Sequence, residues 1–192
     1  MKTKFLSFII FACALALVGC SKSVPDAKPA VPVSVKAIQN NATGFSVGSA
    51  MMKNTIYVFF DPGCPHCAAL WQTSKPLDAE ARFVWIPVGF MGKRSVLQGA
   101  AILAAADPAS AMEAHEASMR ANTGGIALNV DHKAQEALVK KNTQLLTDFG
   151  FTGIPTIVGL NAKTGALTVQ KGESGTDALA NRFGLHSPFG GA

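Results

Sequence analysis

The chain has 192 residues, a formal charge of +5, 48% hydrophobic residues and four cysteines. This length fits one domain behind a leader, and the small charge without a basic run argues against nucleic-acid binding. Lys2 and Lys4 precede an apolar stretch, Phe5–Val18, that is too short to span a membrane and is typical of a secretion signal. Removal of the signal lowers the charge by two, to +3.

The end of this signal contains a cysteine. Leu17-Val18-Gly19-Cys20 resembles the bacterial lipobox, whose cysteine is lipidated and becomes the mature N-terminus. The resemblance implies that residues 1–19 are a lipoprotein signal peptide and that Cys20 carries a lipid that binds the protein to a membrane surface. An ordinary signal with a chance cysteine is the alternative. Residues 20–32, rich in Ser, Pro, Ala and Lys, are expected to form a flexible tether.

Short strands are predicted for residues 33–54. Val31–Ile38 alternates between apolar and other residues, which predicts a strand, and Phe45–Met52 is compatible with a second one. The following segment, Thr55–Phe60, is β-branched and aromatic and predicts a buried strand.

A Cys-x-x-Cys motif, Cys64-Pro65-His66-Cys67, follows that strand and begins a predicted helix with Pro65 in the first turn. At a helix N-terminus the dipole and unpaired backbone N–H groups favour a thiolate, so Cys64 is expected to be nucleophilic. Cys67 is close enough to form a disulfide or to resolve a mixed one. An imidazole of His66 beside the Cys64 sulfur would lower its pKa further; the alternative is an exposed polar residue.

A cysteine pair at this spacing is also found in zinc sites and in structural disulfides. A structural zinc site needs four ligands, and the remaining candidates are isolated histidines, His66, His115, His132 and His186, so no metal site is predicted. An inert disulfide closing so short a loop would stabilise little. We therefore expect a redox-active Cys64–Cys67 disulfide and no added cofactor. A peptide-binding chaperone or assembly factor, and a metal chaperone with two soft thiolate ligands, remain as alternatives.

The helix after the motif is predicted to carry Trp71 into the core and to be interrupted at Pro76. Arg82–Val88 is the next predicted strand, with Pro87 at its exit. An inserted helical layer is predicted over about residues 93–149. Its three helices are Ser95–Ala106, a helix that ends near Arg120 and has Asp107 as N-cap, and Asp131–Phe149.

In the third of these helices, Ala134, Leu138, Leu145 and Phe149 are spaced to form one apolar face. Met112 and Met119, in the second helix, are interpreted as packing residues, with substrate contact as the alternative.

The last third of the chain begins with Gly153-Ile154-Pro155-Thr156. A proline at the mouth of a β-branched strand favours a special geometry such as a cis peptide bond. A turn at Asn161–Gly165, an antiparallel strand at Ala166–Gln170 and a helix at Thr176–Arg182 are predicted to follow. Residues 186–192 are expected to be a mobile tail.

This element order is that of the α/β thioredoxin fold, and residues 55–185 are identified as a catalytic domain of that type. Cys64-Pro65-His66-Cys67 is identical to the active-site tetrapeptide of the DsbA oxidases, and Gly153-Ile154-Pro155-Thr156 is similar to the cis-proline loop of thioredoxins. Between about Thr55 and Gly172 the chain resembles the DsbC/DsbG disulfide isomerases. The shared motifs are Asp61-Pro62, Trp71, Pro76, Pro87-Val88-Gly89, Ala100–Ala104 and Asp107-Pro108.

The resemblance implies a thiol:disulfide oxidoreductase or isomerase of the periplasm, lipid-anchored, with the outer membrane favoured. Its substrates would be cysteine-containing exported proteins, and its redox partner a DsbD-like or DsbB-like membrane protein. Cys64 would be the nucleophile and Cys67 the resolving thiol, with Pro65 and His66 stabilising the thiolate. Ile154 and Pro155 would line the substrate groove.

This sequence differs from the family pattern in three places. Only some thirty residues separate Cys20 from the Thr55 strand, too few for the dimerisation domain of DsbC and DsbG, so a monomer is predicted. Ile154 stands where those isomerases carry Thr. Val58 stands where thioredoxin and DsbA carry a buried acid, so Cys67 is expected to keep its proton more readily.

Overall fold

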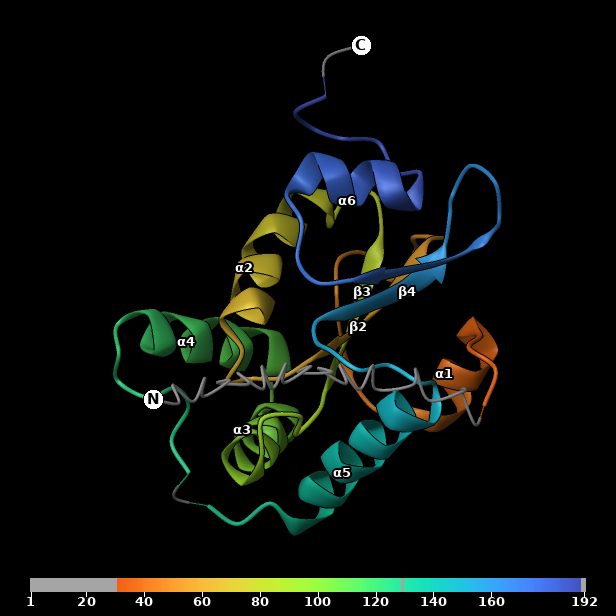
Figure 1. The fold of residues 1–192 in the computed structure, drawn as a ribbon. Helices are drawn as coiled ribbons and strands as arrows, with labels where there is room; N and C mark the ends of the chain where they lie inside the picture. The colour runs from red at the N-terminus through yellow and green to blue at the C-terminus, as the bar shows by residue number, and fades with distance from the viewer. Residues whose placement is uncertain (1–30, 129, 191–192) are drawn as a thin grey trace, which may run out of the picture.

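A five-stranded mixed sheet forms the centre of the molecule in the computed structural model, which describes residues 31–128 and 130–190 (Figure 1). Its spatial order is β1-β3-β2-β4-β5, with β2 and β3 parallel and the other pairs antiparallel. The strands are β1 (Phe45–Val47), β2 (Thr55–Phe60), β3 (Arg82–Pro87), β4 (Thr156–Leu160) and β5 (Leu167–Lys171). The predicted signal, Cys20 and most of the predicted tether lie outside the described residues.

Helices cover both faces of this sheet (Figure 1). They are α1 (Val35–Asn41), α2 (Pro65–Ser74), α3 (Lys93–Ala104), α4 (Pro108–Arg120), α5 (Lys133–Asp148) and α6 (Thr176–Phe183), with a 3-10 turn, η1 (Lys75–Leu77), after α2. The turn falls at the predicted interruption. No helix within residues 31–128 and 130–190 is long and apolar enough to cross a membrane.

The two cores follow from the alternation of β2. Ile56, Val58 and Phe60 point to one face, where they pack with residues of α2, α4 and α6. Tyr57 and Phe59 point to the other face and pack against α1 and α5. Because β2 is central and covered on both sides, its sequence is continuously apolar rather than alternating.

The strand predicted at Val31–Ile38 is wrong, because helix α1 begins within this segment, at Val35. Ser34 is its N-cap, and the Ser34 hydroxyl accepts a hydrogen bond from the Ala37 N–H at 3.1 Å. The second core includes Ile38, and Val35 and Ala42 pack against it. Their spacing of three and four residues is that of one helix face, so the apolar pattern of this segment is compatible with a helix as well as with a strand. The region 33–54 therefore holds one helix and one short strand, β1.

The three predicted helices of residues 93–149 are confirmed, and they do not form one layer. Met112 of α4 lies in the core beside α2, whereas Leu145 of α5 lies in the core on the opposite face. The predicted apolar face of α5 is confirmed at Leu145 and Phe149, which are buried, and wrong at Ala134, which is exposed. Val139, which was not predicted, is also fully buried. Helix α4 and part of α3 therefore lie on the side of the Cys-x-x-Cys motif, and α5 lies on the other side.

Candidate active site at the start of helix α2

Cys64 lies at the point where β2 ends and α2 begins. It is the N-cap residue of α2 in an extended conformation, and Pro65 occupies the first helical turn. The Cys64 carbonyl accepts hydrogen bonds from the N–H groups of Cys67 and Ala68, at 3.0 and 3.1 Å. The Cys64 side chain is thereby placed at the positive end of the helix, as the sequence predicted.

Asp61 shapes the turn that leads into the helix. This carboxylate is fully buried; one oxygen accepts from the Gly63 N–H at 2.8 Å and the other from the Met91 N–H at 2.7 Å. The Asp61 N–H itself points at the Cys67 sulfur, 3.4 Å away. The Asp61 side chain thus connects the turn to the loop after β3, and the Asp61 backbone connects the turn to Cys67.

His115 holds the same turn from the other side. Its Nε2 donates to the Pro62 carbonyl at 2.8 Å, and its Nδ1 accepts from the Ile126 N–H at 3.1 Å, which assigns the neutral Nε2–H tautomer. The ring is fully buried, and burial lowers its pKa below the usual value. Sequence reasoning noted His115 only as an isolated histidine, because its two backbone partners are distant in the chain.

The two cysteines have opposite acidities. Both are free thiols; Cys64 is 6% exposed and Cys67 is fully buried. The Cys64 pKa falls to about 6, first because Cys67 donates a hydrogen bond to the thiolate, and then because the backbone N–H groups of Cys67 and His66 do so. Burial raises the Cys67 pKa far above its usual value, and the Cys64 thiolate adds to the rise. One thiol is therefore ionised near neutral pH while the other keeps its proton.

The His66 side chain is exposed and turns toward a residue that the sequence did not single out. Its Nδ1 lies 3.2 Å from Oε1 of Glu173, in the loop between β5 and α6. This carboxylate raises the His66 pKa, so the imidazole is more often charged. The charge lowers the Cys64 pKa, but it is the smallest of the causes, behind Cys67 and the backbone N–H groups.

The loop before β4 has a cis peptide bond between Ile154 and Pro155, as the sequence predicted. The Pro155 carbonyl accepts from the Gly172 N–H at 2.8 Å, and Gly172 adjoins Glu173. Ile154 is half-buried against the core that contains both cysteines. Hydrogen bonds thus link this loop to the β5–α6 loop and, through Glu173, to His66.

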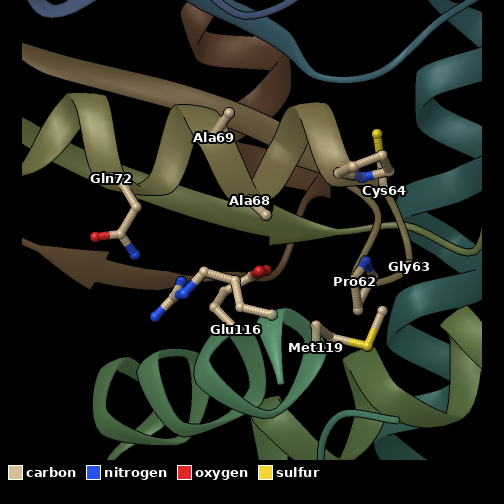
Figure 2. Close-up of a pocket in the computed structure, with 10 residues that line it drawn as sticks. Pro62, Gly63, Cys64, Ala68, Ala69, Gln72, Glu116 and Met119 are labelled. Carbon is tan, nitrogen blue, oxygen red and sulfur yellow. The ribbon is translucent and has the colours of Figure 1, made fainter. Parts of the chain in front are cut away.

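On another side of Cys64, a pocket of about 410 Å3 separates α2 from α4 (Figure 2). The turn before α2 and the first two turns of α2 form one wall, and Glu116, Met119 and Arg120 form the other. Met119 lines this pocket, whereas Met112 is fully buried in the core as a packing residue. Glu116 was missed, since a single glutamate in a helix of mixed polarity carries no signal of burial.

Other predicted residues fall as follows. Trp71 is a core residue, 4% exposed, and its Nε1–H donates to Glu113 at 2.7 Å. Val58 is buried in β2 at 1% exposure. No group of three or more His, Cys, Asp or Glu suited to hold a metal occurs in the part of the chain that the structure describes.

Comparison with known proteins places this site in a family. The model of the thioredoxin-like domain matches residues 48–182. A Pseudomonas aeruginosa protein named thiol:disulfide interchange protein DsbG is 32% identical over 139 residues, covering 71% of this chain and 54% of that protein. The Escherichia coli protein of that name is 34% identical over 107 residues, covering 53% and 42%. The chain thus spans about half the length of these curated relatives.

Among solved structures, the catalytic domain of Proteus mirabilis ScsC has a similar fold. Its TM-score is 0.57 at 21% identity, and the match covers 77% of this chain and 91% of that domain. The predicted α/β fold is confirmed, and the chain belongs to the thioredoxin-like domain family.

Proposed function

We propose that this protein is a thiol:disulfide oxidoreductase in which Cys64 is the nucleophile and Cys67 the resolving thiol. The observation that carries the proposal is the opposite acidity of the two sulfurs, with a Cys64 pKa of about 6 beside a buried, protonated Cys67. A thiolate at neutral pH is the attacking species in disulfide exchange, and a low pKa also makes a good leaving group. The names of the two curated relatives support the same chemistry.

In the reducing direction, the Cys64 thiolate attacks one sulfur of a substrate disulfide and releases the other as a thiolate. Cys67 then loses its proton and attacks the Cys64 sulfur, which leaves a Cys64–Cys67 disulfide and a reduced substrate. The reverse sequence oxidises a substrate dithiol. Burial raises the pKa of Cys67 and thereby opposes the proton loss that resolution requires.

Substrate would lie across the loop that contains Ile154 and Pro155. Gly172 ties this loop to the β5–α6 loop, and Ile154 packs on the core beside both cysteines. An extended segment could pair with the backbone there while its cysteine reaches Cys64, as in strand addition to a sheet edge. Pro65 would fix the first turn of α2, and His66 would add charge near the thiolate.

The cellular setting belongs to the same proposal. Its substrates are cysteine-containing exported proteins in the periplasm, and a DsbD-like or DsbB-like membrane protein restores its redox state. The identity of that partner sets whether oxidation, isomerisation or reduction is the net result. Lipidation at Cys20 holds the domain, as a monomer, at the outer membrane. Cys20→Ala should release the protein into the soluble periplasmic fraction, and light scattering of the unlipidated protein should give the mass of one chain.

The direct test compares two cysteine variants in glutathione exchange and in reduction of a disulfide-bonded protein. Cys64→Ser should lose at least about a thousandfold in rate, because a hydroxyl does not replace the thiolate. Cys67→Ser should accumulate a mixed disulfide through Cys64, visible by mass spectrometry without reductant. Exchange activity that survives in Cys64→Ser would overturn the proposal.

A further inference from the structure

The pocket between α2 and α4 contains a glutamate that the proposed chemistry does not use. Pro62, Cys64 and Ala68 line the α2 side, with Met119 opposite them, so most of the lining is apolar. Glu116 extends from α4 toward α2 into this space (Figure 2). A pocket of about 410 Å3 has room for one long side chain of a bound polypeptide.

Glu116 is buried without a partner. It is 1% exposed, and neither carboxylate oxygen has a hydrogen-bond partner within residues 31–128 and 130–190. A buried carboxyl left in this state is destabilising, and nearly all buried polar groups in native proteins are paired. An oxygen pair of this kind at a pocket wall is therefore complementary to a ligand that brings hydrogen-bond donors.

The charges around the pocket favour a cationic donor. Arg120 lies at the pocket on the same helix; its Nη2 is 3.8 Å from Oε1 of Glu113, and its charge lowers the Glu116 pKa without a hydrogen bond to either Glu116 oxygen. The ionisable groups that influence Glu116 are Arg120, Glu113 and the Cys64 thiol; two of these three become negative. A cation that enters from a substrate meets a buried carboxylate and, next to it, the Cys64 thiolate.

The pocket and the loop with Pro155 contact different parts of the Cys64 surroundings. The pocket runs along α2 toward α4, whereas Ile154 and Pro155 precede β4 and are linked to the β5–α6 loop. A substrate whose cysteine is bonded to Cys64 can place its backbone along that loop and a neighbouring side chain in the pocket. Specificity for sequence around the substrate cysteine then arises in the pocket.

We propose that this pocket is a substrate subsite for a basic side chain, lysine or arginine, close in sequence to the reacting cysteine, and that Glu116 binds its charged end. The aliphatic part of the side chain packs on Ala68 and Met119, and the ammonium or guanidinium group pairs with the two free carboxylate oxygens. This inference rests on the proposed function and specifies its substrates.

The test uses peptide disulfides that differ only in lysine against norleucine, which has the same aliphatic length and lacks the ammonium group. Lysine or norleucine is placed in turn at four positions, the two before the cysteine and the two after it. The ratio of kcat/KM for lysine over norleucine is measured for the wild type, Glu116→Gln and Glu136→Gln. Because both peptides react with the same Cys64, changes in thiolate reactivity cancel in this ratio.

At one position at least, the wild type should prefer lysine by about fivefold or more at pH 8. Glu116→Gln should lower the ratio to about one, and Glu136→Gln, on α5 and outside the pocket, should leave it unchanged. The wild-type ratio should rise between pH 6 and 8 as Glu116 ionises, since its pKa is near 7. Glu116→Gln should show no such rise.

Two outcomes overturn the inference alone: a ratio near one at all four positions with both peptides turned over, or a lysine preference that persists in Glu116→Gln. In both, Cys64-dependent turnover of the norleucine peptide still supports the proposed function. No turnover of either peptide would overturn the proposed function and the subsite together.

Discussion

Two glutamates lie on different sides of Cys64, and their surroundings give them different properties. Glu173, in the β5–α6 loop, is 40% exposed and pairs with His66, whose pKa it raises. Glu116, on α4, is 1% exposed, has both oxygens free in the described part of the structure, and itself has a pKa raised to about 7. Solvent screens the first carboxylate, so it acts weakly at a distance. The second is unscreened and acts strongly on whatever enters its pocket.

The two sides of the site are also attached in different ways. The side of the site that includes α4 is held to the Cys64 turn by His115, through Pro62 and Ile126. The other side is held by the backbone bond between Gly172 and Pro155. A side-chain tether can be removed by mutation, so the contribution of the α4 side can be tested directly.

The largest effect is expected for His115→Ala, which detaches α4 from the turn. The change leaves a cavity and unpairs the Pro62 carbonyl and the Ile126 N–H, so the free energy of unfolding should fall by about 3 kcal/mol. Urea denaturation at neutral pH measures it, with the exposed His186→Ala as control. A loss below about 1 kcal/mol would show that His115 is not the tether.

Glu116→Gln should remove a pH-dependent destabilisation. The folded pKa of about 7 lies above the usual 4.5, so the native state binds the proton more tightly than the unfolded chain. Stability from this group is complete below about pH 4.5 and is lost as pH rises to about 7, by a total of about 3 kcal/mol. The variant should lack this decline in urea denaturation from pH 4 to 8.

As pH rises from about 4.5 to about 7, the free energy of unfolding of Glu116→Gln should therefore increase relative to that of the wild type. Identical pH profiles of the two proteins would contradict the burial of an unpaired carboxylate. Glu136→Gln is again the control, because Glu136 lies on α5 and contacts the exposed Lys140 ammonium as an ion pair.

Cys67→Ala tests which neighbour of Cys64 matters most. The Cys67 hydrogen bond is the largest cause of the low Cys64 pKa, so this pKa should move up from about 6 toward the ordinary thiol value, by about one unit or more. Thiolate absorbance against pH measures the shift. A pKa that stays near 6 would assign the effect to the helix N-terminus alone.

The smallest effect is expected for Glu173→Gln. Loss of the carboxylate lowers the His66 pKa, so the imidazole loses its charge at lower pH and the Cys64 thiolate is slightly less stable. The Cys64 pKa should rise by less than the change in Cys67→Ala, and exchange rates at neutral pH should change less than about threefold. A larger rise of the Cys64 pKa than in Cys67→Ala would show that Glu173 stabilises the thiolate more than Cys67 does.

Much of the fold could be predicted because its patterns are local. The apolar run of β2, Pro65 after Cys64, and Asp107 before Pro108 each specify a strand or helix start from a few neighbouring residues. The cis bond at Pro155 was predicted for the same reason. The strand predicted near Val33 failed because alternation over a few residues also fits a capped helix, and packing on the sheet decides between them.

The sequence by itself determined the thioredoxin-like order of elements and the position of Cys64 at a helix N-terminus, since both depend on short-range periodicity and helix-start chemistry. Only the tertiary structure decided that His66 pairs with Glu173, that His115 holds the Pro62 turn, and that Glu116 is buried beside Cys64. These depend on contacts between residues about 50 to more than 100 positions apart, and burial, which sets the pKa, exists only once those contacts form.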